Sequence, residues 1–309
     1  MVLVYAHDCF LMHDTGDGHP ECSDRLRAIY RRLKQDNFAY LQWREPSEIL
    51  IEKLYFVHTR AYVERVLDMV PDTASVMLDN DTVLGPKSGR AALVAAGAVV
   101  DAVDAIMDGK SKRAFCAVRP PGHHAEADHA MGFCIFNNIA IGAMHALNRH
   151  GVERVAIIDF DVHHGNGTQH SLQSDPRVFF ASMHQSPLYP GTGSMFERGD
   201  HNNVLNIPLR PSSRGDDLRT VVTTMLVPSL AAFQPQLVMV SAGFDAHTDD
   251  PLANLQFCCD DYGWLTTELT TIADNYANGR LVSVLEGGYN LTALADSAAA
   301  HVAALSTNI

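Results

Sequence analysis

Six short segments of this chain are almost entirely apolar, and they constrain the fold more than any other feature of the sequence. They are rich in Val, Ile, Leu and Phe and do not alternate with polar residues, which is the pattern of strands covered on both faces. Strands of this kind occur in parallel sheets that lie between two layers of helices. The six segments are VLVYA at 2–6, AFCAV at 114–118, RVAIID at 154–159, RVFFAS at 177–182, QLVMVS at 236–241 and RLVSVL at 280–285.

Helical patterns lie between many of these segments. Residues 89–110 are Ala-rich and close at Gly109, residues 137–151 begin with an Asn cap and close at Gly151, and residues 260–279 close at Gly279. The alternation of strands and helices predicts an α/β fold with a central, mostly parallel sheet flanked by helices. Hydrophobic residues make up 47% of the 309 residues, which is enough for a large core. We therefore expect residues 1–309 to form one domain.

Five of the predicted strands end in polar or glycine-rich sequence. The segments that follow them are RPPGHH, DFDVHHGNG, MHQSPLYPGTG, AGFDAHTDD and EGGYN. In an open parallel sheet, ligands bind at the carboxyl ends of the strands. Gly, Pro and Asp are also ordinary turn residues, but five such strand ends together favour an active site at this edge of the sheet.

The segment DFDVHHGNG has the spacing of a metal site. Asp159, Asp161 and His163 alternate, so in an extended chain they share one side of the strand tip. Asp161 and His163 can reach one cation, and Asp245, at another strand end, is the best candidate for a third ligand. Two carboxylates and one imidazole leave a coordination position open, as a catalytic zinc site requires. Manganese and ferrous iron accept the same ligands, so the spacing leaves the identity of the metal open.

Two other strand ends offer acid–base groups. His123 and His124 are adjacent in RPPGHH, and a histidine near a metal-activated water can act as a general base. The second histidine needs a carboxylate partner, and Asp159 is available because Asp161 is assigned to the metal. Tyr289 follows two glycines, and its hydroxyl can donate to an oxyanion on the side opposite the metal.

The composition limits the class of partner and the compartment. The net charge of −13 disfavours binding to nucleic acid and is compatible with a cationic substrate. The N-terminal sequence MVLVYAHDCF has no basic region and is typical of a first strand rather than a signal peptide. No window approaches the roughly 18 apolar residues of a membrane span. The six cysteines show no CxxC spacing, which indicates reduced thiols and predicts a cytoplasmic location.

Compound motifs run in a single order along nearly the whole chain. They are HPECSDRLRAI at 19–29, RPPGHHAE at 119–126, GFCIFNN at 132–138, DFDVHHGNGTQH at 159–170, PGTG at 190–193, LVMVSAGFDAH at 237–247, DPL at 250–252 and EGGYNL at 286–291. With these motifs the chain resembles the histone deacetylase family, more closely its class II branch together with the bacterial acetylpolyamine amidohydrolases. The resemblance implies an arginase/deacetylase-like fold, with residues 1–309 as a single deacetylase-like catalytic domain.

The resemblance implies two bound cations. One is a catalytic zinc ion, one per chain, with Asp161, His163 and Asp245 as its ligands. The other is a structural potassium ion. Its implied ligands are the side chains of Asp159 and Ser182 and the main-chain carbonyls of Asp161, His163 and Met183.

The resemblance also implies roles for the groups around the zinc. His124 resembles the general base and later acid, His123 an electrostatic partner paired with Asp159, and Tyr289 the residue that polarises the amide carbonyl. Asn166, the expected partner of His124, stands where class I members carry Asp, so this partner is neutral, as in class II. The implied reaction is a zinc-dependent hydrolysis that removes acetyl or related acyl groups from lysine side chains through attack by a metal-activated water.

The substrate channel is implied by fewer positions. Gly132, Phe133 and Tyr189 match positions that line the acyl-lysine tunnel, and Tyr189 replaces the usual Phe. Polyamine-selective relatives carry a Glu at the tunnel mouth where this chain has Leu252, which favours acetyl-lysine peptides over acetylated polyamines. Asp81, in the LDNDT loop, is expected at the rim as an acceptor for the substrate backbone, or otherwise as a solvated loop acid.

Three alternative functions stay open at this stage. An acetylpolyamine amidohydrolase or another small-molecule amide deacylase would use the same residues. A binuclear manganese hydrolase of the arginase type needs further bridging carboxylates, and none stands next to His163 or Asp245. A binding module that reads acetyl-lysine would be indicated by a missing ligand, base or Tyr, and none is missing. No nucleic acid or membrane partner is expected.

Overall fold

The core of the protein is a sheet of parallel strands in the order β2-β1-β5-β10-β9-β6-β7-β8. The computed structural model describes residues 1–307. The strands of this sheet are β1 (Val2–Tyr5), β2 (Gln42–Arg44), β5 (Arg113–Cys116), β6 (Val155–Asp159), β7 (Val178–Gln185), β8 (Val204–Leu209), β9 (Leu237–Ala242) and β10 (Leu281–Leu285). A small antiparallel hairpin, β3 (Val76–Met77) and β4 (Val83–Leu84), lies apart from the sheet.

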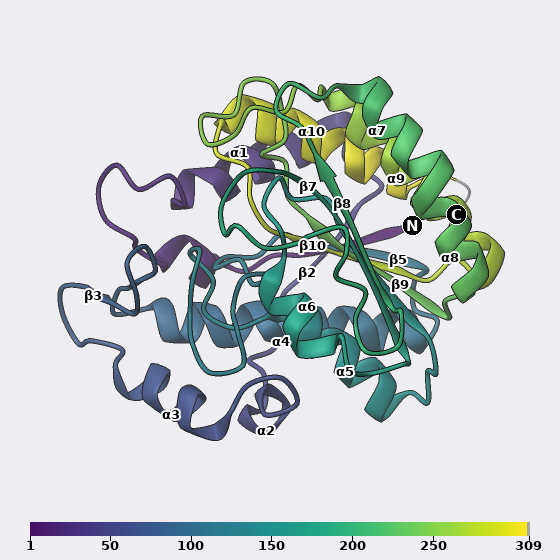
Figure 1. Ribbon diagram of the computed structural model, residues 1–309. Coiled ribbons are helices and arrows are strands. Elements are labelled where there is room, and N and C mark those ends of the chain that lie inside the picture. Colours follow the sequence, from purple (N-terminus) through teal and green to yellow (C-terminus); the bar gives the residue numbers. More distant parts are fainter. Residues whose placement is uncertain (308–309) are drawn as a thin grey trace.

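Helices cover both faces of the sheet (Figure 1). One layer contains α2 (Ile51–Leu54), α3 (Arg60–Asp68), α4 (Ser88–Met107), α5 (Asn138–Arg149) and α6 (Asn166–Leu172). The other contains α1 (Ser23–Leu33), α7 (Gly215–Val221), α8 (Val227–Phe233), α9 (Cys259–Tyr276) and α10 (Leu291–Leu305). Every residue of the six predicted strands β1, β5, β6, β7, β9 and β10 is buried. The predicted α/β fold with a helix-flanked parallel sheet is therefore confirmed.

The three predicted helices form within a few residues of their expected bounds, and local chemistry explains their ends. Helix α5 begins where the Asn137 side chain accepts a hydrogen bond from the amide of Ala140. Helices α4 and α5 are followed by Gly109 and Gly151, whose positive φ angles of 73° and 64° let the chain turn away. The third predicted helix is α9.

Two strands of the sheet were not among the six predicted ones, and both lie at its edges. Strand β8 has Asn206 and Pro208 within an otherwise apolar segment. Pro208 cannot donate a ladder hydrogen bond, and an edge strand tolerates this because one of its sides needs no partner. Strand β2 is only three residues long and incompletely buried, so its sequence carries no apolar pattern.

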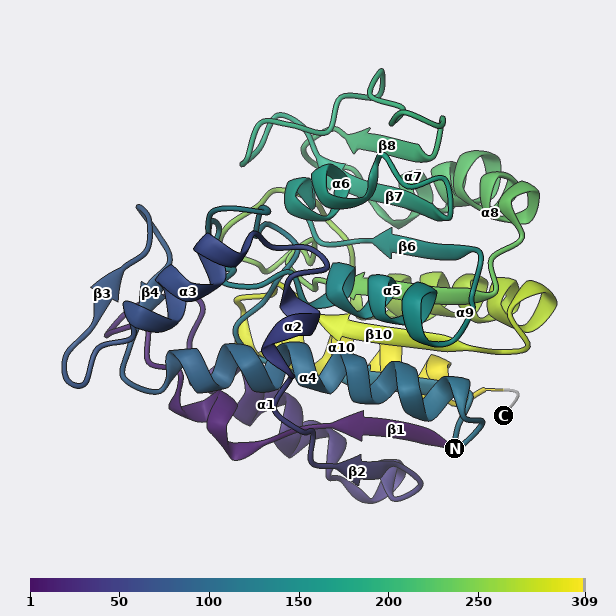
Figure 2. The same ribbon diagram turned by 90° about the horizontal axis from the view of Figure 1, so that it is seen from below.

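The strands point in one direction, and their carboxyl ends lie on the left in Figure 2, away from the labelled chain termini. The site residues predicted from the strand ends thus belong to one edge of the molecule. No helix among the described residues is long and apolar enough to cross a membrane. All six cysteines are free thiols; the predicted cytoplasmic location stays a prediction.

Candidate active site

The loops after β5, β6, β7, β9 and β10 converge on a cavity of about 210 Å³ at the carboxyl edge of the sheet. It brings together residues that are as far apart in sequence as Asp81 and Tyr289. The cavity is lined by Asp81, His124, Gly132, Phe133, His163, Leu188, Tyr189, Leu252 and Tyr289. All five residues predicted to contact substrate are in this lining, together with one predicted metal ligand, the predicted base and the predicted oxyanion donor.

The three predicted zinc ligands form a compact cluster beside this cavity. Nδ1 of His163 lies 3.0 Å from Asp161 Oδ1 and 3.2 Å from Asp245 Oδ2. The second oxygen of each carboxylate accepts a main-chain amide: Gly287 N–H donates to Asp161 Oδ2 at 2.8 Å, and Val162 N–H donates to Asp245 Oδ1 at 2.9 Å. One nitrogen and two carboxylate oxygens thus face one another and are oriented by the backbone, a donor set that fits zinc.

Two glycines make room for this cluster. A Cβ atom on Gly243 would lie 2.1 Å from Asp161 Oδ2, and a Cβ atom on Gly287 would lie 2.1 Å from Asp245 Oδ2. Both distances are far below van der Waals contact. A side chain at either position would therefore clash with a carboxylate, and only glycine fits.

The electrostatics of the cluster favour a positive charge at its centre. Burial opposes protonation of His163, but its hydrogen bonds to Asp161 and Asp245 outweigh this and raise its pKa to about 10. Burial and the neighbouring Asp161 carboxylate raise the pKa of Asp245 to about 7. The space between the carboxylates is therefore suited to a proton on His163 or to a metal cation in its place.

Two other groups of three potential ligands occur in the part of the chain that the structure describes. The first group is His123, Cys134 and Glu286, all three of which are buried. In the second group Asp104 Oδ1 accepts hydrogen bonds from Nε2 of His145 at 2.7 Å and of His150 at 2.6 Å. These two bonds join α4 to the C-terminal end of α5, so both carboxylate contacts are explained by helix packing.

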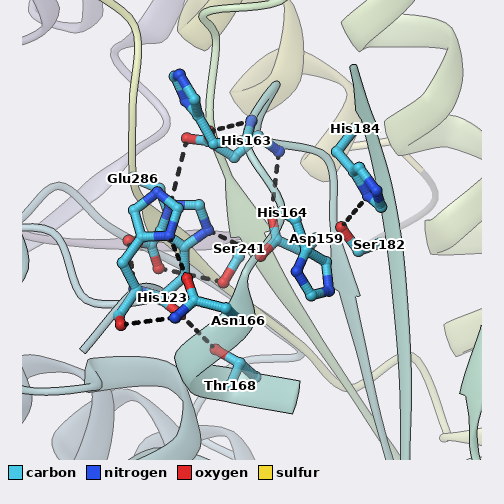
Figure 3. Close-up of polar contacts among 12 residues, drawn as sticks. His123, Asp159, His163, His164, Asn166, Thr168, Ser182, His184, Ser241 and Glu286 are labelled. Atoms are coloured by element: carbon cyan, nitrogen blue, oxygen red, sulfur yellow. Dashed lines mark hydrogen bonds and ion pairs between the residues drawn. The ribbon is translucent and has the colours of Figure 1, made fainter. Parts of the chain in front are cut away.

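The adjacent histidines have different partners. His123 Nδ1 lies 2.9 Å from Asp159 Oδ2 (Figure 3). His124 Nδ1 lies 2.7 Å from Asn166 Oδ1. Burial opposes a charge on His123, but Asp159 and then Asp161 outweigh it and raise its pKa to about 10. Burial and the neighbouring His123 hold the pKa of His124 well below its usual range. At neutral pH His123 is therefore the charged ring and His124 the neutral one.

Tyr289 also lines the cavity and is held there by three contacts. Its main-chain N–H donates to Asp250 Oδ2 at 2.7 Å, its ring packs edge-on against Phe133 at 5.9 Å, and the Arg25 guanidinium lies 5.0 Å from its ring centre. Burial raises the pKa of its hydroxyl well above the usual range. The hydroxyl therefore stays protonated and can act as a hydrogen-bond donor.

The predicted channel residues form the apolar wall of the cavity. Gly132 and Phe133 both have positive φ angles, 57° and 68°, and a Cβ atom on Gly132 would lie 2.4 Å from His124 Cδ2. Asp81 Oδ1 accepts the amide of Gly132 at 3.0 Å, so this carboxylate supports the wall rather than standing free in solvent. Tyr189 packs edge-on against His124 at 5.2 Å.

Three of the residues predicted for potassium lie on the neighbouring strands β6 and β7, and the other two, Asp161 and His163, lie in the loop after β6. Asp159 and Ser182 are register partners of β6 and β7, both are fully buried, and Met183 follows in β7. Ser182 Oγ is 2.9 Å from His184 Nδ1, and Asp159 Oδ1 accepts the amide of Asp161 at 3.1 Å. The side-chain oxygens are of the type that potassium prefers.

A buried ion network beneath the site was not predicted. Glu21 accepts Arg25 Nη1 at 2.9 Å and Arg119 Nη2 at 2.7 Å, and all three side chains are fully buried. Arg25 also donates to the carbonyl of Gly288 at 2.6 Å, next to Tyr289. The motifs HPECSDRLRAI and RPPGHHAE contain these three residues, but their spacing does not reveal that they meet.

Two further carboxylates support the histidines. Glu286 Oε2 accepts the amides of Gly122 at 2.7 Å and His123 at 3.2 Å. Glu126 accepts the side-chain amide of Asn166 at 2.5 Å. Both belong to the motifs EGGYNL and RPPGHHAE, and only the fold shows what they contact.

Comparison with known proteins agrees with this geometry. The family model of the histone deacetylase domain matches residues 19–305. Histone deacetylase 14, chloroplastic, of Arabidopsis thaliana is 39% identical, over 98% of this chain and 76% of its own length. The histone deacetylase-like amidohydrolase of Pseudomonas aeruginosa is 39% identical, over 88% of this chain and 73% of its own. The crystal structure of the HDA15 HD domain superimposes with a TM-score of 0.93 at 35% identity, over 98% of this chain and 87% of that one.

Proposed function

Because this chain belongs to the histone deacetylase family of deacetylases and amidohydrolases, we propose that it is a zinc-dependent hydrolase that removes acetyl groups from lysine side chains. One observation supports this most directly. The cluster of Asp161, His163 and Asp245 adjoins an apolar cavity that His124 and Tyr289 also line. The proposal treats the whole chain as one catalytic unit.

Zinc held by Asp161, His163 and Asp245 would act as a Lewis acid towards the substrate carbonyl and a water molecule. The apolar wall of Phe133, Leu188 and Tyr189 suits the methylene chain of an acyl-lysine and excludes bulk water from it.

His124 is the general base in this proposal. Its Nδ1 is engaged with Asn166, and a neutral ring leaves Nε2 free to take a proton from the attacking water. The same nitrogen then returns the proton to the departing amine, so that acetate and a free lysine amine are formed. The charged ring of His123, paired with Asp159, offsets negative charge that develops beside it.

Tyr289 is the oxyanion donor. Its protonated hydroxyl lines the cavity and would donate a hydrogen bond to the carbonyl oxygen as negative charge builds on it. A donor of this kind contributes roughly 2.7–4 kcal/mol and a positioned base roughly 10²–10⁴-fold. Neither is sufficient for an unactivated amide, so the metal, the base and the hydroxyl act together.

Potassium is proposed as a structural ion at Asp159, Ser182 and the carbonyls of Asp161, His163 and Met183. It would offset the charge of the buried Asp159 carboxylate behind the metal ligands. A cytoplasmic location is proposed from the six free cysteines.

Acetyl-lysine peptides are the proposed substrates, because the exposed cavity residue Leu252 offers no charge to the secondary ammonium of a polyamine. Deacetylation of an acetylated polyamine is the second candidate. It is favoured by the Asp81 carboxylate in the cavity lining and by the net charge of −13.

The proposal is tested by removing metal with a chelator and restoring it with Zn²⁺, Mn²⁺ or Fe²⁺. Each form is then assayed with acetyl-lysine peptides, longer acyl-lysine peptides and N8-acetylspermidine. We expect Zn²⁺ to restore hydrolysis of acetyl-lysine and a hydroxamate to inhibit it. Full activity in the metal-free protein, or no hydrolysis of any of these amides by the zinc form, would overturn the proposal.

A further inference from the structure

Four side chains form a hydrogen-bonded chain that leads from the proposed base towards the surface. His124 Nδ1 lies 2.7 Å from Asn166 Oδ1, Asn166 Nδ2 donates to Glu126 Oε1 at 2.5 Å, and His170 Nδ1 lies 2.8 Å from the same Glu126 oxygen. Asn166 and Glu126 are buried, whereas His170 is exposed.

From this chain we propose that Glu126 is a positioning residue that sets the orientation of the Asn166 amide and thereby the tautomer of His124. The proposal rests on the proposed function, in which His124 Nε2 must be free to accept a proton. It assigns a task to Glu126, a residue of the RPPGHHAE motif that the mechanism otherwise leaves unused.

The orientation matters because an amide has two different ends. With Oδ1 of Asn166 towards His124, the imidazole must carry its proton on Nδ1, and Nε2 keeps the lone pair that a base needs. With the amide reversed, Nδ2 would donate to Nδ1, the ring proton would move to Nε2, and His124 could not accept a proton there. A carboxylate at position 166 would accept the Nδ1 proton of His124 in either orientation, since both of its oxygens are acceptors.

The surroundings of Asn166 decide between the two orientations. Its Nδ2 faces three atoms that can only accept: Glu126 Oε1 at 2.5 Å, Met131 Sδ at 3.2 Å and the carbonyl of His124 at 3.4 Å. Reversing the amide would put Oδ1 against a buried carboxylate. The bond to Glu126 is short and charge-assisted, whereas the bond to the His124 carbonyl is long and a thioether is a weak acceptor, so Glu126 is the strongest of the three constraints.

The carboxylate itself is held in place from two sides. His170 Nδ1 binds the oxygen that Asn166 uses. The main chain of Glu126 is fixed separately, because its amide donates to the carbonyl of His129 at 3.0 Å and its carbonyl contacts His58 Nδ1 at 2.9 Å. Truncating the side chain therefore removes the strongest constraint on Asn166 and leaves these backbone contacts in place.

Single variants give the first test, measured as kcat, KM and zinc content. Glu126→Ala should lower kcat at least about tenfold with KM changed less than about twofold and zinc content unchanged, because the tautomer matters to proton transfer and not to binding. Glu126→Gln should keep most of the activity, since its carbonyl oxygen can still accept from Asn166. The matched control is Asp128→Ala, which removes an exposed carboxylate from the same loop and should have no effect.

The second test uses a double variant. If Glu126 had only a structural role, the outcome expected here would not occur. Asn166→Asp alone should lose activity, because it sets a second carboxylate against Glu126. In the Glu126→Ala background the same change should restore kcat, because the introduced carboxylate accepts from His124 in either orientation. We expect the double variant to be more active than either single variant. A double variant no better than Glu126→Ala would overturn the proposal.

A readout without catalysis separates this proposal from the proposed function. Nitrogen-15 NMR of the imidazoles should show the Nδ1–H tautomer of His124 in the wild-type protein and a shift towards Nε2–H in Glu126→Ala. An unchanged tautomer would overturn the role of Glu126 even in an active enzyme. The expected shift in a protein that hydrolyses no amide would leave the role of Glu126 intact and overturn the proposed function instead.

Discussion

His123 and His124 are adjacent in the chain, their ring centres lie 4.0 Å apart, and their electrostatic environments are opposite. His123 faces a buried carboxylate and has a pKa of about 10, whereas His124 faces an uncharged amide and has a pKa well below the usual range. The charge on the first ring helps to keep the second one neutral. One dipeptide thus supplies both a fixed cation and a candidate base.

We expect the two histidines to differ in their mutational effects. His124→Ala should nearly abolish turnover, with kcat falling by about 10²–10⁴-fold or more, because no other neutral base among the described residues lines the cavity. His123→Ala should leave more activity, since it removes a charge and not the proton acceptor. Steady-state kinetics on an acetyl-lysine peptide measures both effects. A larger loss of kcat in His123→Ala than in His124→Ala would mean that His123 is the base and His124 its electrostatic partner.

Substitution of a metal ligand is expected to lower the metal content of the protein, and the loss of activity follows from the loss of metal. We expect elemental analysis to find one zinc ion per chain in the wild type and sharply less in Asp161→Asn or Asp245→Asn, because each change replaces an anionic ligand with a neutral amide. Asp249→Asn is the matched control, an exposed carboxylate in the same loop as Asp245. Full zinc occupancy and activity in either ligand variant would contradict the assignment.

Tyr289→Phe is expected to lower kcat by about 10²-fold or more and to leave KM nearly unchanged, because the hydroxyl acts mainly in the transition state. The ring and its contacts to Phe133 and Arg25 are retained in this variant. If KM alone rises, Tyr289 binds substrate and does not stabilise the oxyanion.

Substitution of Leu252 tests whether the protein prefers acetyl-lysine peptides or acetylated polyamines as substrates. It lines the cavity and is 36% exposed, so a carboxylate at this position would meet the substrate at the mouth. Leu252→Glu should shift kcat/KM towards N8-acetylspermidine, because a partly desolvated carboxylate–ammonium pair is stronger than a surface pair. Competing-substrate assays measure the shift. Faster turnover of acetylspermidine than of every acetyl-lysine peptide by the wild type would favour the polyamine instead.

Glu21 is expected to make stability depend on pH. Burial raises the pKa of this carboxyl, but Arg119 and then Arg25 outweigh it and hold the pKa below its usual range. A depressed pKa in the folded state means that the stabilisation is complete above the unfolded value of about 4.3 and declines as the pH falls below it. At neutral pH Glu21→Gln should lower the free energy of unfolding by about 3–5 kcal/mol, because two buried guanidinium groups lose their counter-ion.

The measurement is denaturant unfolding of wild type and Glu21→Gln at a constant zinc concentration, at pH 7 and at a series of lower values. The difference between the two proteins should narrow below about pH 4, where the wild-type carboxyl takes up a proton in the unfolded state while it stays ionised in the folded state. A difference that stays constant with pH would mean that lost packing, and not lost charge, destabilises the variant.

Much of the sheet was predictable because its strands carry a local signal. The segments around Ile157 and Val240 are almost entirely apolar, since helices cover both faces of the sheet. The family was predictable for a related reason: the motifs at 119–126 and 159–170 each contain several chemical groups in a short run. The edge strand β8 carried a weaker signal, because an edge position tolerates Asn206 and Pro208.

Within the candidate site, sequence spacing was informative only over short distances. It associated Asp161 with His163, which are two residues apart, and the order of strand ends suggested Asp245. It did not reveal that Arg25 lies beneath Tyr289, or that Glu126 contacts Asn166, forty positions away.

The sequence by itself therefore determined the buried parallel sheet, the edge at which the polar groups gather and the chemical types of those groups. Only the tertiary structure decided which carboxylate faces which histidine and which arginine lies under the tyrosine. The reason is physical. These contacts depend on the strand order, in which β10 lies between β5 and β9, and strand order is set by the packing of the whole core and by no local pattern.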